Sequence, residues 1–211
     1  MPDEYRPTEW FEPLYRDAGE SGAGPSWAHM ETQPSFKAWL DQKDLKGGDR
    51  SALVVGCGMG DDAIELSSRG FKVTAFDVSE SAIAHCNRRF PDSDVTFLQG
   101  DLFAENAGWA GRFDFVLEIY TIQALPPRYE DEVIGRIADY VAEDGQLLVV
   151  AIVGSEERSF ESGPPWALTP DHIQTFQRRG LTVVDRIIRE KASKKGDDVW
   201  ITAFQRSTEN E

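Results

Sequence analysis

The chain has 211 residues, which suffice for one sizeable α/β core and are few for two, so we expect a single domain. Its 22 basic and 37 acidic side chains give a formal net charge of −15 at pH 7, which disfavours binding to the polyanionic backbone of a nucleic acid. No basic amphipathic stretch points to an anionic membrane surface, so we expect neither nucleic acid nor membrane as partner.

The first 34 residues are rich in glycine, proline and aromatic side chains, and we predict an N-terminal arm or lid with one short helix near residues 11–17. No apolar run of signal-peptide or membrane-spanning length begins the chain. Two cysteines, Cys57 and Cys86, are too few for a disulfide framework or a zinc site. We therefore expect a cytoplasmic location, no metal site, and one main domain at residues 35–211.

From residue 35 onward, short apolar runs alternate with segments of helical period. Helices are predicted at residues 35–42, 61–69, 79–89 and 128–142, with a further one starting at Thr169. Strands are predicted at residues 51–55, 71–76, 95–98, 113–119, 146–152, 181–189 and 198–205. Asp144 and Gly145 are read as a turn into the strand at 146–152. The polar stretch 190–197 joins the last two strands.

This alternation predicts a single-domain, Rossmann-like α/β fold with a doubly wound sheet. Parallel neighbours need a crossover connection, which the intervening helices supply, and those helices then cover both faces. The final hairpin adds one antiparallel strand to an otherwise mostly parallel sheet.

The run VGCGMGDDA at residues 55–63 directly follows the first strand, where ligands bind in such sheets. Three glycines, Gly56, Gly58 and Gly60, permit unusual dihedrals and a close approach of the backbone to a ligand, although a tight turn alone would also use them. Asp77 stands 21 positions after Gly56 at the end of the second strand. A carboxylate there can accept from both hydroxyls of an adenosine ribose, which we favour over a role at the next helix N-terminus.

Two aspartates, Asp61 and Asp62, decide between two adenosine ligands. A dinucleotide would place its pyrophosphate at the start of the helix after the glycines, where exposed N–H groups attract anions. Carboxylates in that turn oppose an anion, but they suit the sulfonium and ammonium groups of S-adenosylmethionine. Stabilisation of the helix dipole, roughly 0.3–1 kcal/mol per carboxylate, is compatible with this reading.

A third candidate contact follows the third strand at Asp101 and Leu102, where the carboxylate can accept from an adenine amino group and the apolar side chain can wall the ring. Ligand-type residues then stand at the ends of three successive strands. The full set of candidate cofactor contacts adds neighbours of these residues and two tryptophans of the arm: Trp10, Trp27, Gly56, Cys57, Gly58, Gly60, Asp62, Asp77, Val78, Asp101, Leu102, Glu118 and Ile119.

With these residues in place, the chain resembles the class I S-adenosylmethionine-dependent methyltransferases, and among them the thiopurine S-methyltransferase-like and thiol/halide methyltransferase-like members. The resemblance lies in LVVGCGMGDDAIELSSRGFKVTAFDVSESAI, FDFVLEIYTIQALPP and GPPWALTPDHIQTF, and in the arm tryptophans. It implies methyl transfer from S-adenosylmethionine, with S-adenosylhomocysteine as product, to a small thiol or other soft nucleophile. The departure is Glu118-Ile119 in place of the Asp-Arg that thiopurine-type enzymes carry at the end of the fourth strand.

Candidates for a proton-accepting catalytic group are Glu118, Tyr120 and His29. Each also has a simpler interpretation. Glu118 could only hold the methionine ammonium group, Tyr120 could be a packing aromatic, and His29 could be a surface histidine. Trp10, Trp27 and Trp166 could cover the sulfonium or line an apolar acceptor pocket, or simply pack. The remaining histidines, His85 and His172, are read as surface residues, and the remaining tryptophans, Trp39, Trp109 and Trp200, as packing residues.

Other functions remain open at this point. The acceptor could be an oxygen or nitrogen nucleophile, the domain could be a non-catalytic S-adenosylmethionine-binding module, or the chain could be a nicotinamide-dependent oxidoreductase, since residues 58–63 also satisfy the relaxed G-x-G-x-x-A pattern. The identity of the acceptor and the oligomeric state leave no mark in the sequence.

Overall fold

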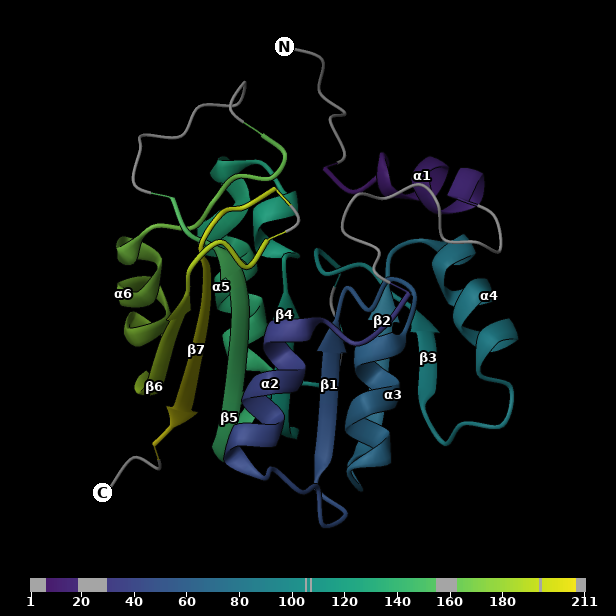
Figure 1. The fold of residues 1–211 in the computed structure, drawn as a ribbon, viewed down its shortest axis with the longest axis horizontal. Helices are drawn as coiled ribbons and strands as arrows, with labels where there is room; N and C mark the ends of the chain where they lie inside the picture. The colour runs from purple at the N-terminus through teal and green to yellow at the C-terminus, as the bar shows by residue number, and fades with distance from the viewer. Residues whose placement is uncertain are drawn as a thin grey trace.

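A seven-stranded sheet forms the centre of the molecule (Figure 1). The computed structural model describes residues 7–18, 30–104, 106, 108–154, 163–193 and 195–207. The strands are β1 (Ser51–Val55), β2 (Lys72–Asp77), β3 (Thr96–Gln99), β4 (Phe113–Ile119), β5 (Val141–Ile152), β6 (Leu181–Arg189) and β7 (Val199–Arg206). The helices are α1 (Phe11–Ala18), α2 (Pro34–Lys43), α3 (Asp61–Ser68), α4 (Glu80–Arg89), α5 (Glu130–Asp139) and α6 (Pro170–Arg178), with the 3-10 turns η1 (Ile122–Ala124) and η2 (Pro127–Tyr129).

The strand order is β3-β2-β1-β4-β5-β7-β6, which confirms the predicted doubly wound fold with one antiparallel strand. β7 is antiparallel to both of its neighbours, while the pairs from β3 to β5 are parallel. The chain winds outward from β1 to β3 and then returns to β4 on the other side of β1. This reversal leaves a crevice beyond the carboxyl ends of β1 and β4, the usual ligand position in such sheets.

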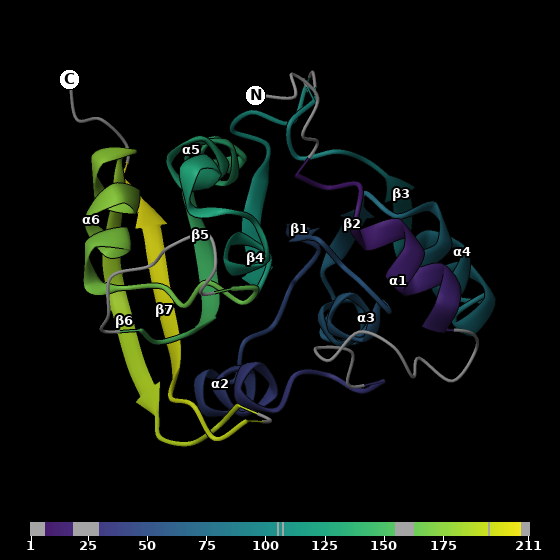
Figure 2. The same ribbon diagram turned by 90° about the horizontal axis from the view of Figure 1, so that it is seen from above.

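Helices cover both faces of the sheet, as Figure 2 shows from above. On one face, Phe36 and Leu40 of α2, Leu66 of α3 and Cys86 of α4 pack against alternate residues of the strands. On the other face, the apolar stripe of α5 and Phe176 of α6 pack against the remaining strand residues. Both faces are therefore buried, which explains why the parallel strands read as continuous apolar runs.

The boundary between α5 and β5 differs from the sequence prediction. The helix ends at Asp139 rather than at residue 142, and Val141 already pairs with Phe113 in the sheet. Asp144, with φ of 58°, lies inside β5 rather than in a turn before it, at a register shift of the β4–β5 pair. A Cβ on Gly145 would approach the carbonyl oxygen of Phe113 to 2.9 Å, so glycine is required at this irregularity.

The prediction that His85 and His172 are surface residues is wrong, because their exposed fractions are only 6% and 8%. The α1 helix packs over α4, and His85 Nε2 donates to the carbonyl oxygen of Tyr15 at 3.2 Å. His172 completes a capping box at the start of α6, and its Nε2 lies 2.9 Å from Glu130 Oε2. Both side chains join neighbouring elements through hydrogen bonds that their ring nitrogens supply.

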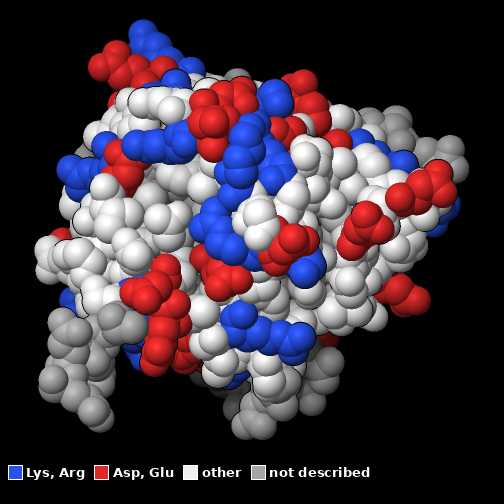
Figure 3. All heavy atoms as spheres, turned by 90° about the horizontal axis from the view of Figure 1, so that it is seen from below, with Lys and Arg blue, Asp and Glu red and all other residues white. Residues whose placement is uncertain are grey.

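The lower face of the molecule, shown in Figure 3, intersperses lysine and arginine with aspartate and glutamate. Oppositely charged side chains also form ion pairs among the described residues, such as Arg69 with Glu65, at 2.7 Å, and Lys46 with Asp44, at 2.8 Å. Such a face offers no continuous basic surface to a polyanion. None of the described helices combines the length and the apolar character that crossing a membrane requires.

Candidate functional site

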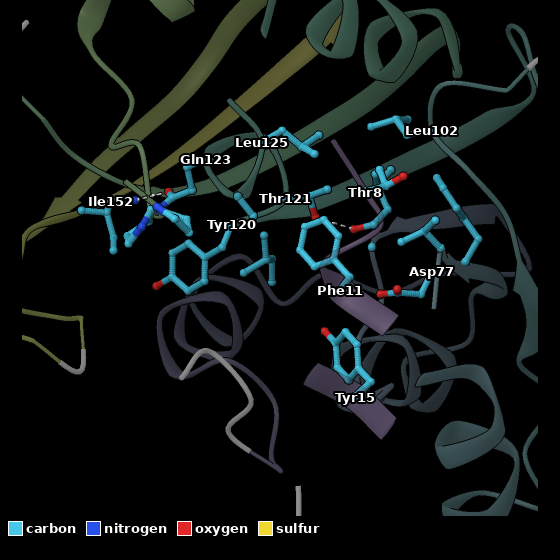
Figure 4. A pocket seen from close by; sticks show the side chains of 18 of the residues that line it. Thr8, Phe11, Tyr15, Asp77, Leu102, Tyr120, Thr121, Gln123, Leu125 and Ile152 are labelled. Atoms are coloured by element: carbon cyan, nitrogen blue, oxygen red, sulfur yellow. Dashed lines mark hydrogen bonds between the residues drawn. The ribbon is translucent and has the colours of Figure 1, made fainter. Parts of the chain in front are cut away.

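A cavity of about 260 Å³ lies beyond the carboxyl ends of the central strands. Figure 4 shows Asp77 and Leu102 toward one end of it, Gln123 and Ile152 toward the other, and Phe11 and Thr121 between them. A second hollow, of about 70 Å³, borders the glycine loop and shares Tyr15, Val55, Gly56, Ile119 and Tyr120 with the first. The predicted crevice is therefore present as two adjoining spaces.

The glycine loop takes the backbone conformation that its composition predicts. Gly56 has φ of 62°, and a Cβ there would lie 2.5 Å from Thr121 Oγ1. Gly58 has φ of 53°, and its Cβ would lie 2.9 Å from the hydroxyl oxygen of Tyr15. A side chain at either position would be both strained and obstructed, so these glycines serve conformation and close packing together.

Asp77 shapes the glycine loop and lines the large cavity. Its Oδ2 accepts from the backbone N–H of Gly58 at 2.9 Å, and its Oδ1 accepts from the N–H of Ser79 at 3.0 Å. The second bond confirms the helix N-terminal role without excluding a ligand role, because each carboxylate oxygen retains acceptor capacity. Burial raises the pKa of Asp77 to about 6, against three backbone hydrogen bonds that lower it.

The two aspartates that follow the glycines have different partners. Asp61 forms a bidentate ion pair with Arg89, at 2.7 and 2.8 Å, so its charge is compensated within the protein. Asp62 instead accepts from the backbone N–H of Gln33 at 2.8 Å and lines the smaller hollow. Desolvation raises the pKa of Asp62 to about 7. Of the two carboxylates, Asp62 is therefore the one that can attract a cationic ligand.

Gln33 links the start of α2 to the end of β4. Its Oε1 accepts from the N–H of Phe36 at 2.7 Å, and its Nε2 donates to the hydroxyl oxygen of Tyr120 at 3.0 Å. Tyr120 has φ of 62°, an uncommon conformation for an aromatic residue, and lines both spaces. Desolvation raises its pKa. The phenol thus stands between the two spaces as a neutral group whose own proton is available for donation.

Glu118 does not lie where its predicted roles require. The side chain is fully buried and lines neither space, and its Oε1 accepts from the N–H of Ile122 at 3.0 Å. Burial raises its pKa to about 7. Contact of Glu118 with a cofactor ammonium or an acceptor proton stays a prediction that this geometry does not favour. What the carboxylate does here is hold the first N–H groups of the η1 turn.

The structure brings most of the predicted contact residues together around the two spaces. Those in the lining are Gly56, Cys57, Gly58, Gly60, Asp62, Asp77, Val78, Leu102, Ile119 and Tyr120. Contact with Cys86 and burial raise the pKa of the Cys57 thiol well above its usual value, so this wall residue is a neutral thiol.

Other predicted residues lie elsewhere. Asp101 is not in the lining, and its Oδ1 accepts from the N–H of Phe103 at 2.8 Å in a local turn. Trp10 stacks on Phe11 outside the lining, with ring centroids 4.3 Å apart, and Trp166 is buried. Trp27 and His29 lie outside the described residues. Among the described residues, no cluster of histidine, cysteine, aspartate and glutamate could hold a metal ion.

Two further segments line the cavity: the arm, which was predicted as a lid but through other residues, and the β6–β7 connection, which was not predicted to reach the site. From the arm come Thr8, Phe11 and Tyr15, and from the β6–β7 connection Ala192, Ser193, Lys195 and Asp197. The i, i+4 spacing of the two arm aromatics was a usable signal for a shared helix face. No pattern in the polar connection indicates contact with a cavity, because that contact depends on long-range packing.

The Glu12 carboxylate attaches the arm to the start of α4, in addition to the hydrogen bond between His85 and the Tyr15 carbonyl oxygen. Glu12 of α1 accepts from the hydroxyls of Ser79 and Ser81, both at 2.6 Å, and from the N–H of Ser81 at 3.2 Å. These groups lie at the N-terminus of α4, where unpaired N–H donors and the helix dipole favour a carboxylate. The contact holds Phe11 and Tyr15 over the cavity.

Comparison with known proteins gives one domain family and several distant relatives. A family described as "Methyltransferase domain" matches residues 52–145. A thiopurine S-methyltransferase of Pseudomonas aeruginosa is 24% identical over 168 residues, which cover 72% of this chain and 76% of that protein. A probable thiol methyltransferase 2 of Arabidopsis thaliana is 27% identical over 154 residues, which cover 71% of this chain and 65% of that protein. The chain thus spans just under two thirds of this plant relative.

Among solved structures, the Burkholderia thailandensis 1,6-didemethyltoxoflavin-N1-methyltransferase, with S-adenosylhomocysteine bound, superposes with a TM-score of 0.71 at 19% identity. The superposition covers 99% of this chain and 93% of that one. At this identity the likeness establishes a shared fold. Of the alternatives that the sequence leaves open, methyl transfer is the one that the matched family supports.

Proposed function

Because the chain belongs to the class I S-adenosylmethionine-dependent methyltransferases, we propose that it is a small-molecule S-methyltransferase that acts on a thiol or a related soft nucleophile. One observation carries the proposal: a single cavity of about 260 Å³ has a carboxylate-bearing end beside the glycine loop and an apolar end beyond β4 and β5. The donor and a small acceptor would share this space.

The carboxylate-bearing end, with Asp77, and the adjoining smaller hollow, with Asp62, together fit S-adenosylmethionine. Neither Asp62 nor Asp77 forms an ion pair within the described part of the chain, and burial raises the pKa of both. A cationic ligand beside them would favour their ionised forms. Asp77 would hold the ribose hydroxyls, the loop at Gly56 and Gly58 would border the methionyl part, and Leu102 would wall the adenine. When bound, the cofactor supplies a methyl group made electrophilic by its sulfonium.

The opposite end of the cavity fits a compact apolar acceptor. Its walls include Ile119, Leu125, Ile152, Pro164 and Pro165. The two prolines belong to the segment that, by resemblance, closes an acceptor pocket. Apolar walls exclude water and hold the nucleophile in line, which is most of what a displacement at an already activated methyl requires.

Two considerations favour a thiol as the methyl acceptor: the ease with which thiols lose their proton, and the names of the related proteins. The described lining holds no histidine, the buried phenol of Tyr120 has a raised pKa, and the carboxylate that the β6–β7 connection brings to the cavity, Asp197, is a weak base toward an alcohol. A nucleophile that ionises near neutral pH needs the least help, and thiols do so far more readily than alcohols. The names of the Pseudomonas and Arabidopsis relatives point the same way.

We also propose that residues 1–34 act as a lid over a catalytic domain of residues 35–211. Supporting this division, Thr8, Phe11 and Tyr15 line the cavity, and Glu12 attaches their helix to α4. The lid would exclude water once both substrates are bound.

A screen with methyl-labelled S-adenosylmethionine tests the proposal. Thiols, phenols, amines and halides of matched size are incubated with the protein, and labelled products are identified by mass. The proposal expects the highest kcat/KM with an aromatic thiol. Transfer to phenols or amines alone would contradict the thiol assignment and favour an O- or N-methyltransferase, a second candidate that the structurally similar N1-methyltransferase supports.

A further inference from the structure

At the acceptor end, one buried side-chain atom, Gln123 Nε2, has no hydrogen bond partner among the described residues. Six buried side-chain polar atoms have no partner within the described residues: Ser93 Oγ, Glu118 Oε2, Gln123 Nε2, Arg189 Nε, Trp200 Nε1 and Thr202 Oγ1. Of these six residues, Gln123 is the one that lines the cavity. Its exposed fraction is 1%. Buried polar groups are nearly always paired, so an unpaired one beside a ligand cavity requires an explanation.

The orientation of this amide follows from its neighbours. Gln123 Oε1 accepts from the backbone N–H of Ile152 at 2.8 Å, a contact drawn in Figure 4. Because that N–H can only donate, the amide oxygen must face it, and the NH₂ group must take the other position. The residue is also held by its backbone, since its carbonyl oxygen accepts from the N–H of Trp166 at 2.7 Å. A donor with no acceptor is therefore held rigidly.

Much of the lining near the amide is apolar, and the β6–β7 connection adds the polar residues Ser193, Lys195 and Asp197 to the cavity. Leu125, Ile152, Pro164 and Pro165 line the same end of the cavity and carry no side-chain acceptor. A donor placed among such walls discriminates strongly between ligands, because a ligand that lacks an acceptor leaves the donor unpaired in the complex. The Nε2 donor of Gln123 is therefore placed where it can select one substrate over another.

We propose that Gln123 Nε2 donates a hydrogen bond to a neutral acceptor atom, such as a carbonyl oxygen, on the methyl-accepting substrate. The inference rests on the proposed function in that it takes this end of the cavity as the acceptor site. It narrows the substrate to an apolar, ring-sized nucleophile that bears a hydrogen bond acceptor. Simple alkyl thiols and halide ions fall outside this class.

Matched substrates test the inference. The 2-, 3- and 4-acetyl derivatives of thiophenol carry a carbonyl oxygen, and the corresponding isopropyl derivatives have a similar shape without it. We expect kcat/KM of at least one acetyl isomer to exceed that of its isopropyl counterpart about tenfold or more, and Gln123→Leu to abolish the difference. The same pairs are measured as phenols and anilines, so that the preferred nucleophile and the acetyl preference are read separately.

A second variant and a binding control distinguish loss of the Gln123 donor from loss of the folded structure. Gln123→Glu retains an acceptor for the N–H of Ile152 and loses the NH₂ donor, so at pH 8 it should lose the acetyl preference as Gln123→Leu does. S-Adenosylhomocysteine affinity within threefold of wild type shows that either variant is folded. Equal rates for all acetyl and isopropyl pairs in the wild type, or an acetyl preference that persists in both variants, would overturn the inference. Activity on phenols with a Gln123-dependent acetyl preference would refute only the thiol assignment.

Discussion

Asp77 joins the glycine loop to the cavity through a single carboxylate. Its replacement by alanine removes a charge-assisted contact to the ribose and the support of the Gly58 N–H. We expect Asp77→Ala to weaken S-adenosylhomocysteine binding by roughly 1.5–3 kcal/mol, measured by isothermal titration calorimetry. Asp77→Asn retains one acceptor oxygen and should lose less. Unchanged affinity in the alanine variant would remove Asp77 from the cofactor site.

Asp62 gives cofactor binding a dependence on pH. Its pKa of about 7 means that the carboxylate is neutral below that pH and ionised above it. Only the ionised form attracts an ammonium group, so S-adenosylhomocysteine affinity should rise as pH increases from 5.5 to 8. Asp62→Asn should bind about tenfold more weakly than wild type at pH 8, roughly 1.4 kcal/mol, and nearly equally at pH 5.5. Parallel pH profiles of the two proteins would contradict this role.

Glu118 should limit stability at high pH. Burial raises its pKa from 4.5 to about 7, so the folded state favours the neutral acid and loses stability as pH rises through that range. Glu118→Gln keeps an oxygen for the N–H of Ile122 and removes the buried charge. We expect the variant to unfold with a free energy higher by on the order of 1–3 kcal/mol at pH 8, and with little difference at pH 4.5. Urea denaturation at both pH values measures this, and a variant that is less stable at pH 8 would show that the carboxylate is paired.

Some residues of the site could be predicted from the sequence, and others could not. The glycines and Asp77 were predictable because backbone conformation and strand-end position constrain them locally. Glu118 was not, because Glu118 and Tyr120 stand two positions apart and would share one face of an extended strand, whereas β4 ends at Ile119 and Tyr120 takes a positive φ of 62°. Asp101 carried a turn signal and a ligand signal at once, and the structure uses the turn.

Among the elements, α1 is joined to α4 by the hydrogen bonds of Glu12 and by the His85–Tyr15 contact. We expect Glu12→Ala to raise the Kd for S-adenosylhomocysteine about three- to tenfold, because the variant releases the helix that carries Phe11 and Tyr15. Arg16→Ala, on the same helix, is the matched control, since Arg16 is exposed and pairs with its neighbour Asp17. Equal affinity in both variants would show that the arm binds the domain by other contacts.

Element boundaries could be predicted where the apolar residues follow a single spacing, either that of a helix or that of a strand. β1, β4 and β6 match their predicted ranges, and Ser79 and Thr169 cap the helices assigned to them. The end of α5 was not predictable, because Val141 satisfies the apolar stripe of a helix and the preference of a strand equally well. Pairing with Phe113, a contact distant in sequence, places it in β5.

At the scale of the whole molecule, the fold brings two segments that lie far apart in the sequence, the arm and the β6–β7 connection, to one cavity. The arm approaches from the side of β2 and α4, and the β6–β7 connection from the side of β5 (Figures 1 and 2). The doubly wound fold and the crevice were predictable from the alternation of strands and helices. The arm was predicted as a lid, but the residues by which it reaches the cavity were not, and nothing local in the polar β6–β7 connection encodes the surface that it meets.

The central claim is that the crevice beyond β1 and β4 binds an adenosyl donor with a positively charged centre and disfavours a diphosphate. Isothermal titration of the wild-type protein with S-adenosylhomocysteine and, separately, with NADH at pH 8 tests it most directly. We expect saturable binding of one S-adenosylhomocysteine per chain and no measurable heat with NADH. Saturable NADH binding without binding of S-adenosylhomocysteine would contradict the account.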